Sequence, residues 1–371
     1  PFGAIFFGHI GDRKGRKVTM YASLLMMGIS TSIIGILPPA ASAGVGVVIV
    51  LQLMRLAQCF GRGGTWGGGI LMAYENVPEN KRSFYAAIPQ IGLPIGFGLS
   101  SILIAVPTLL LPEDIFFTWG WRIPFLAAII LTLIVIRQKG EMMETEDYKK
   151  AQAKLEAEEA EGKKHKVGFI PMVKGYWKTL LLGCGTRWVD GTFYNIFIVW
   201  ILSYCINWLG MPLIQTYIIT IIACIFKIPF TLFGGWCAQK LGNTRTFVIG
   251  ALASAVLSIP TLKVIELSKG NLAITIIGIV LGWSIAYNLI WAVISSLWSS
   301  YFETEVRYSG ISFVYHVPSF LVAGMVPTIC TLLINYGKGD TIYVGIYSTV
   351  VALISAACAL ALKARHDRGE K

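Results

Sequence analysis

Long apolar stretches recur along the whole sequence, and they restrict the possible folds more than any other feature. Crossing about 30 Å of hydrocarbon takes about 20 mostly apolar residues. Eleven stretches of this kind can be counted, the first of them short. They lie near residues 1–10, 18–38, 44–73, 84–110, 119–137, 178–204, 212–237, 245–263, 271–299, 309–334 and 341–363. Backbone groups in lipid must be hydrogen-bonded within their own segment, so each stretch is predicted to be a helix.

The amount and placement of charge agree with a protein that lies in lipid. Charged residues make up 14% of the 371 positions, whereas a soluble domain carries about a quarter. Of the 31 Lys and Arg residues, 23 fall in alternate connections that include the loop at residues 13–17. The positive-inside rule therefore places this loop and the C-terminus in the cytoplasm. The net charge of +11 is a signal of topology and does not indicate a nucleic-acid partner.

One long polar stretch, at residues 138–176, divides the apolar stretches into two groups. It contains the run KKAQAKLEAEEAEGKKHK, which is typical of an exposed helix with charge pairs one turn apart. We therefore predict a solvated cytoplasmic linker between an N-terminal helix bundle at 1–137 and a C-terminal bundle at 177–371. The chain opens on Pro1 with a short apolar stretch. We expect a first helix and part of a second to be missing from a twelve-helix parent.

A weak internal repeat supports the division into two halves. Residues 8–17 read GHIGDRKGRK and residues 235–244 read GWCAQKLGNT, so Gly15 and Gly242 are 227 positions apart. A second repeated pair consists of Glu75 and Arg82 in the first half, and Glu303 and Arg307 in the second. Parallel repeats are a transporter design in which the solute site lies between two halves that rock around it.

The first copy of the repeat carries a recognisable motif. It has the form G-x-x-x-D-R-x-G-R-K and follows a membrane segment, and in this it resembles the major facilitator superfamily. The matching residues are Gly8, Gly11, Asp12, Arg13, Gly15, Arg16 and Lys17. The closer resemblance is to the metabolite:proton symporter branch, which includes shikimate, 2-oxoglutarate, citrate and proline/betaine carriers. It is carried by RLAQCFGRGGTWGGG (55–69), ENVPENKR (75–82), WGWRIPF (119–125), ETEVRYSGISFVYH (303–316) and AGMVP (323–327).

The resemblance implies an all-α membrane protein with two six-helix bundles. It further implies a secondary active transporter that moves a small metabolite by proton-coupled alternating access in the bacterial plasma (inner) membrane. We expect no enzyme activity, no cofactor and no metal site, and we expect the monomer to suffice. The alternative function is a solute sensor with a transport fold, which would bind its solute without translocating it.

The resemblance also implies that Asp12 to Lys17 form a latch that closes the cytoplasmic side. Four further residues are assigned to this gate: Glu75, Arg82, Glu303 and Arg307. We expect the Asp12 carboxylate at the start of the following helix, where the helix dipole favours negative charge. The alternative is that these basic residues reflect topology alone. The second copy carries Gln239 and Asn243 in place of the acid and the second arginine, so the latch is predicted to be asymmetric.

Ionisable residues inside the apolar stretches are the candidates for the substrate and proton pathway. An ionisable group at that depth must face a partner or a water-filled cavity. The candidates form two stripes at helical spacing and one further position: Arg55, Gln58, Arg62 and Trp66; Arg187, Asp190 and Tyr194; and Lys227. The alternative is structural, with Arg187 and Asp190 neutralising each other and Arg62 reaching the membrane surface.

The charges inside the apolar stretches favour an anionic substrate, because they comprise four basic residues and one acid, Asp190. The basic residues are Arg55, Arg62, Arg187 and Lys227. Arginine binds carboxylates through two parallel hydrogen bonds, which makes an organic carboxylate or a zwitterion the expected cargo. Cys59 and Thr65 replace a glycine and a glutamate of the branch's pattern, which puts its usual proton route in doubt. Asp190 is then the first candidate proton carrier and His316 the second. The residues Tyr287, Asn288, Trp291 and Tyr315 either line the cavity or pack in the core.

Overall fold

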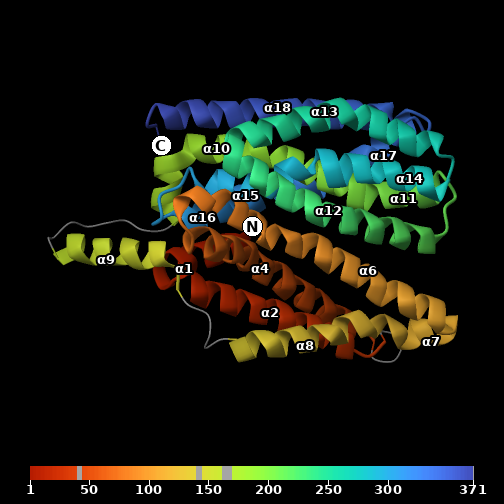
Figure 1. The fold of residues 1–371 in the computed structure, drawn as a ribbon. Coiled ribbons are helices and arrows are strands. Elements are labelled where there is room, and N and C mark those ends of the chain that lie inside the picture. The colour runs from red at the N-terminus through yellow and green to blue at the C-terminus, as the bar shows by residue number, and fades with distance from the viewer. Residues whose placement is uncertain (40–43, 139–143, 161–168, 371) are drawn as a thin grey trace. The chain divides into compact units, whose positions relative to one another are not determined.

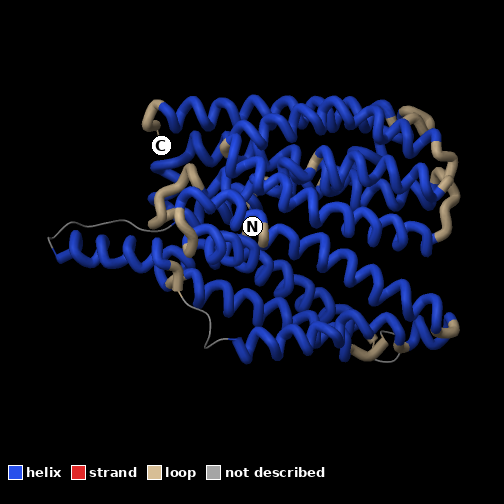
Figure 2. Tube along the Cα trace, in the orientation of Figure 1, coloured by secondary structure: helices blue, strands red, loops and turns tan. Residues whose placement is uncertain are grey.

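The computed structural model describes residues 1–39, 44–138, 144–160 and 169–370. Within these ranges every regular element is a helix, as Figure 2 shows. Ten helical spans in this part of the chain are long and apolar enough to cross a membrane. The short first stretch forms α1 (Phe2–Lys14). The prediction of an all-α membrane protein is therefore confirmed. Most helix ends lie within a few residues of the expected ones, but α10 begins at Phe169, nine residues earlier than expected.

The described chain divides into two compact units, each made of segments that are distant in the sequence. Unit 1 comprises Pro1–Asn76, Ser100–Met172 and Glu303–Phe313. Unit 2 comprises Val77–Leu99, Val173–Phe302 and Val314–Lys371. The division into bundles at 1–137 and 177–371 stays a prediction.

Unit 1 is built around helices that pack closely through small residues. Its helices are α1, α2 (Arg16–Ile36), α4 (Val45–Glu75), the second half of α6 (Gly92–Leu110), α7 (Glu113–Thr118), η3 (Gly120–Arg122), α8 (Ile123–Arg137), α9 (Glu146–Ala160) and the start of α16 (Arg307–His316). Helix α2 packs against α4 and α8, and α1 packs against α4 (Figure 1). A Cβ atom on Gly63 would lie 2.3 Å from the Ala4 nitrogen. The lack of a side chain at Gly63 therefore lets α4 and α1 approach closely.

Unit 2 contains the longer helices of the second half of the sequence. Its elements are η1 (Glu79–Lys81), α5 (Arg82–Ala87), η2 (Pro89–Ile91), the first half of α6, most of α10 (Phe169–Tyr194), η5 (Asn195–Trp200), α11 (Ile201–Asn207), α12 (Leu213–Leu241), α13 (Asn243–Leu267), α14 (Leu272–Ile279), η6 (Val280–Ala286), α15 (Asn288–Ser299), the end of α16, η7 (Phe320–Gly324), α17 (Val326–Tyr336) and α18 (Ile342–Asp367). Helix α13 packs against α15 and α18 (Figure 1). The segments η5, η6 and η7 are π-helical, a geometry frequent at functional sites.

The internal repeat is visible in the backbone of two helix corners, one in each unit. Gly15 joins α1 to α2 with φ +101° and ψ 159°. Gly242 joins α12 to α13 with φ +89° and ψ 151°. This region of backbone space is essentially restricted to glycine. The two glycines that the sequence places 227 positions apart therefore form the same corner twice.

Candidate functional site

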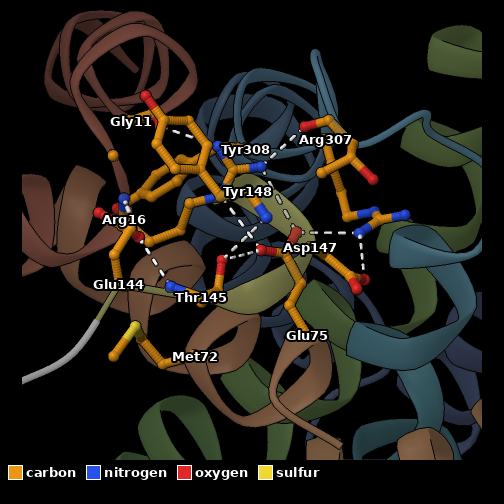
Figure 3. Close-up of polar contacts among 12 residues, drawn as sticks. Gly11, Arg16, Met72, Glu75, Glu144, Thr145, Asp147, Tyr148, Arg307 and Tyr308 are labelled. Atoms are coloured by element: carbon orange, nitrogen blue, oxygen red, sulfur yellow. Dashed lines mark hydrogen bonds and ion pairs between the residues drawn. The ribbon is translucent and has the colours of Figure 1, made fainter. Parts of the chain in front are cut away.

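Arg16 lies at the centre of a buried ionic cluster in unit 1 (Figure 3). Its Nε atom lies 3.3 Å from Oε2 of Glu75, at the end of α4. Its guanidinium also donates to the backbone oxygens of Gly11, at 2.9 Å, and Thr304, at 2.7 Å. Arg307 approaches the same carboxylate from α16, with Nη1 2.9 Å from Oε1 of Glu75. Three elements are thus joined through one glutamate, which we call the Glu75 cluster.

Asp12 binds the first turn of α16, a helix nearly 300 residues later in the chain. Its two carboxylate oxygens accept hydrogen bonds from the backbone amides of Tyr308, at 3.1 Å, and Ser309, at 3.0 Å. These amides have no partner inside their own helix, and the positive end of the helix dipole favours the carboxylate. The expectation of a dipole-stabilised acid is met, but the expected helix was wrong: Asp12 lies in the last turn of α1 and caps α16 instead of the helix that follows it.

The glycines of the motif allow this approach. A Cβ atom on Gly11 would lie 2.4 Å from Cδ2 of Tyr308. A Cβ atom on Gly8 would lie 3.1 Å from the Ser309 Cα atom. Any larger side chain at Gly11 would push α16 away from the Asp12 carboxylate.

Burial changes the ionisation of Asp12. Removal from solvent raises the pKa of this carboxyl to about 6, although Arg16 and the amides of Ser309 and Tyr308 act in the opposite direction. The Oδ1 atom of Asp12 lies 3.7 Å from Nη1 of Arg16, so the ion pair is not in close contact. The buried Asp12 carboxyl therefore takes up a proton near neutral pH more readily than an exposed aspartate does.

The beginning of the predicted linker is part of the same cluster, which corrects the prediction that it is solvated. Glu144 accepts hydrogen bonds from the backbone amides of Arg16, at 2.9 Å, and Lys17, at 3.2 Å. It thereby caps the N-terminus of α2. Thr145 is fully buried and donates to Oε2 of Glu75 at 2.7 Å. The helical part of the linker is confirmed by α9, whereas residues 139–143 and 161–168 lie outside the described residues.

Tyr148 and Asp147 extend the contact between the linker and the Glu75 cluster. The Tyr148 ring lies 4.7 Å from the Arg16 guanidinium carbon, and its hydroxyl donates to the Arg13 backbone oxygen at 2.9 Å. Oδ2 of Asp147 lies 3.7 Å from Nη1 of Arg307. Sequence reasoning missed Glu144, Thr145, Asp147 and Tyr148. Their composition is that of an ordinary exposed helix, and their partners are at least 70 positions away.

The remaining predicted gate residues have other surroundings. Arg13 and Glu303 are exposed, and Lys17 is half-buried. Arg82 lies in unit 2, where it forms an ion pair with Glu79 at 3.7 Å. Their assignment to the gate stays a prediction.

A second buried charge site lies in unit 2. Arg187 and Asp190 form an ion pair within one turn of α10, and the Tyr287 hydroxyl donates to the other Asp190 oxygen. The Arg187 guanidinium carbon lies 4.3 Å above the Tyr315 ring, and its Nε donates to the Tyr315 backbone oxygen at 3.2 Å. The pairing that the sequence left as an alternative is present, and the expected neighbours Tyr287 and Tyr315 are part of it.

Lys227 lies near this pair on α12, fully buried. Its ammonium nitrogen is 4.4 Å from the ring centroids of both Trp283 and Tyr287. Tyr287 therefore contacts both Asp190 and Lys227, and we call these residues together with Arg187 the Asp190 site. Trp283 was not singled out from the sequence, because one tryptophan in an apolar helix carries no signal of its own.

The other pathway candidates are not part of the Asp190 site. Arg55 and Arg62 on α4 are both exposed. Gln58 donates to the Thr31 hydroxyl of α2 at 2.7 Å, and Arg55 contacts Gln58 at 3.5 Å. Trp66 is half-buried. The role of this stripe in the pathway stays a prediction.

Two further candidates, His316 and Tyr194, have aromatic neighbours. The ring of His316 is 4.8 Å from that of Tyr315. The ring of Tyr194 is 5.9 Å from that of Phe97. Neither contact assigns a role in transport.

Comparison with known proteins identifies the family. A sequence profile described as Major Facilitator Superfamily matches residues 2–327, which is most of the chain. The chain belongs to the Major Facilitator Superfamily. Members of this superfamily are membrane transporters, so the predictions of the family and of a protein that is not an enzyme are confirmed.

Related sequences and solved structures agree with this assignment to the Major Facilitator Superfamily. The chain is 33% identical to the inner membrane metabolite transport protein YhjE of Escherichia coli (strain K12), over 99% of this chain and 82% of that protein. It is 31% identical to the shikimate transporter of the same organism, over 98% of this chain and 81% of that transporter. The structure of the proton:xylose symporter XylE with 6-bromo-6-deoxy-D-glucose matches with a TM-score of 0.73 and 16% identity, over 96% of this chain and 82% of that one. At this identity the structural likeness shows a common fold alone.

Proposed function

We propose that the chain is a proton-coupled symporter that carries a small organic carboxylate or zwitterion by alternating access. The observation that carries the proposal is the Asp190 site. Two cations, Arg187 and Lys227, are buried there, and the carboxylate of the site, Asp190, is paired with Arg187. A buried excess of positive charge is stabilised by an anionic ligand, and a guanidinium supplies paired donors for a carboxylate.

The Asp190 site also supplies a route to proton coupling. Asp190 is almost fully buried and holds Arg187 and the Tyr287 hydroxyl. Protonation of Asp190 removes the negative charge that neutralises Arg187, and the guanidinium then becomes available to the substrate carboxylate. Loss of the proton restores the ion pair and releases the substrate. The symporters XylE and FucP, which share the fold, are named as proton-coupled carriers of xylose and fucose.

The Glu75 cluster serves in this proposal as the cytoplasmic latch. We place it and the linker on the cytoplasmic side, because the basic residues gather there. Asp12 and Glu75 hold the first turn of α16 through hydrogen bonds and an ion pair. Release of both contacts would free the start of α16 and allow the cytoplasmic side to open.

Uptake by proteoliposomes tests the proposal. Labelled shikimate, 2-oxoglutarate, proline and glycine betaine are offered with an inward proton gradient, with and without a protonophore. We expect accumulation of a carboxylate that the protonophore abolishes. Asp190→Asn should lose accumulation against a gradient, and the matched change Asp114→Asn, at an exposed acid on α7, should not. Binding of solute without accumulation by the wild type would contradict the proposal and favour a sensor.

A further inference from the structure

Lys227 is the most unusual buried group of unit 2. Its side chain is fully buried in the middle of α12, a helix of 29 residues. Among the described residues, its ammonium nitrogen has no hydrogen-bond acceptor. Removing an ammonium from water without a hydrogen-bonding partner is costly, so this position requires a compensating function or ligand.

Aromatic rings surround the Lys227 ammonium. Its nitrogen lies 4.4 Å from the centroid of Trp283, 4.4 Å from that of Tyr287 and 5.9 Å from that of Trp291. Three rings at such distances form the type of aromatic cage that proteins use to bind quaternary ammonium ligands. In this chain the cage contains the protein's own cation.

Hydrogen bonds on both sides hold the cage in place. The Trp291 indole donates to the Gln90 backbone oxygen at 3.1 Å, and the Gln90 amide donates to the Trp291 backbone oxygen at the same distance. Asn288 donates to the Lys227 backbone oxygen at 2.7 Å, which fixes the start of α15 against α12. Ser284 of η6 donates to the Ala223 oxygen at 2.8 Å, one turn before Lys227. The rings are therefore positioned before any ligand arrives.

The chemistry that is missing from the cage is a hydrogen-bond acceptor. In the described part of the chain, the indole nitrogen of Trp283 is buried without an acceptor, as is the ammonium of Lys227. Asp190, the nearby acid, is engaged by Arg187 and Tyr287. A carboxylate ligand would accept from both free donors, whereas a cation would offer them no acceptor and would be repelled by Lys227.

We propose that Lys227 is the residue that sets substrate class: its ammonium occupies the aromatic cage, binds the carboxylate of the substrate and excludes betaines and other quaternary ammonium compounds. This inference rests on the proposed transport function and narrows its substrate from a carboxylate or zwitterion to a carboxylate without a quaternary ammonium group. Trp283 contributes the second donor through its indole nitrogen.

The test measures ligand affinity of the detergent-purified full chain by thermal stabilisation. The carboxylate probes are shikimate and 2-oxoglutarate. The quaternary ammonium probes are tetramethylammonium, a cation, and glycine betaine, a zwitterion. Lys227→Met removes the charge and keeps the volume, and loss of a charged hydrogen-bonding partner predicts about a tenfold or larger drop in carboxylate affinity. Lys227→Ala empties the cage, so the two quaternary ammonium probes should now stabilise the protein against thermal unfolding. Trp283→Phe should lower carboxylate affinity several-fold and leave the cage closed to cations.

The matched control is Lys240→Met, on the same helix. Lys240 is exposed and lies 4.4 Å from the Trp236 ring, so it has a similar contact outside the site. We expect Lys240→Met to bind all four probes with the same affinities as the wild type. Lys227→Met removes a buried ammonium that has no hydrogen-bond acceptor among the described residues, so this variant is expected to fold.

Two results would overturn the inference. One is a folded Lys227→Met protein with unchanged carboxylate affinity, and the other is a wild-type chain that none of the carboxylate probes stabilises. Failure of the transport proposal looks different. In that case the wild type and variants would show the expected affinities, but proteoliposomes would not accumulate the carboxylate.

Discussion

The two glycine corners have the same backbone and opposite chemistry. At the first corner, Gly15 is flanked by Asp12 and Arg16, which take part in a buried ionic network. At the second corner, Gly242 is flanked by Gln239 and Asn243. There the Gln239 amide donates to the Asn80 backbone oxygen, and Asn243 accepts from Ser296 at 3.0 Å. The first corner is held by charge and the second by neutral hydrogen bonds.

This difference separates what the fold needs from what the proposed latch needs. A glycine with positive φ recurs at the corner in both units. This indicates that the fold requires such a residue where one helix turns into the next. The first corner carries a buried ionic network, which connects α1, α4, α16 and the linker. The charged residues beside Gly242, Lys240 and Arg245, lie outside its hydrogen bonds to Asn80 and Ser296. We therefore assign the ionic residues to gating and the glycines to the fold, and the following predictions test that assignment.

The largest contrast is expected between Arg16→Ala and Asn243→Ala, which are equivalent positions of the repeat. Removing one partner of a buried ion pair costs about 3–5 kcal/mol, because the remaining charge is left without compensation. Loss of a neutral hydrogen bond at Asn243 costs about 1 kcal/mol. Thermal unfolding of both purified variants measures the difference. Equal losses at the two corners would show that the charges have no special role.

The second contrast is in the dependence on pH. The pKa of Asp12 is raised to about 6 by burial, so between pH ~4 and ~6 the folded chain holds a proton that the unfolded chain releases. The free energy of unfolding should therefore fall by up to about 3 kcal/mol as the pH rises through this window, at 1.36 kcal/mol per pKa unit. The unfolding midpoint of Asp12→Asn should not fall with pH in this way. The midpoint of Asp114→Asn should depend on pH as that of the wild type does. A wild type without this slope would refute the prediction.

The glycines themselves provide the third contrast. An alanine at Gly242 has open space around its Cβ atom and should cost about 1–3 kcal/mol for the backbone conformation alone. An alanine at Gly15 costs more, because its Cβ atom would lie 2.0 Å from Oε2 of Glu144. Adding Glu144→Ala to Gly15→Ala should recover part of the loss. Unfolding measurements on the two single variants and the double variant decide this, and no recovery would mean that Glu144 does not touch this corner.

The smallest effect is expected for Glu144→Ala alone. It removes the cap of α2, which is worth about 1 kcal/mol. Glu156→Ala is the matched control, because Glu156 is an exposed acid on α9, the helix that follows Glu144. If both variants unfold at the same temperature, the cap contributes nothing measurable.

Much of the fold could be predicted from the sequence, because membrane helices are encoded locally. An apolar run of sufficient length is enough to place α12 or α18, and the spacing of Gly15 and Gly242 indicated that they occupy equivalent positions. The buried charges Arg187, Asp190 and Lys227 were found for the same reason: an ionisable residue inside an apolar run is visible without a structure.

The partners of these residues could not be predicted, because they depend on contacts between distant segments. Glu75 meets Arg307 across 232 positions, and Arg16 meets Glu144 across 128. The sequence suggested that Asp12 stabilises a nearby helix, and only the packing of α1 against α16 selects the distant one. The aromatic cage of Lys227 likewise depends on how η6 presents Trp283 towards α12, which no sequence spacing determines.

Amide hydrogen exchange tests the central claim, that the ionic corner holds α16 and the neutral corner has no such role. Exchange of the segment 303–313 is measured in the wild type, in Asp12→Ala and in Gln239→Ala. The account predicts about tenfold faster exchange of this segment in Asp12→Ala, as expected for loss of a helix cap, and no change in Gln239→Ala. Unchanged exchange in Asp12→Ala, or equal acceleration in both variants, would contradict it.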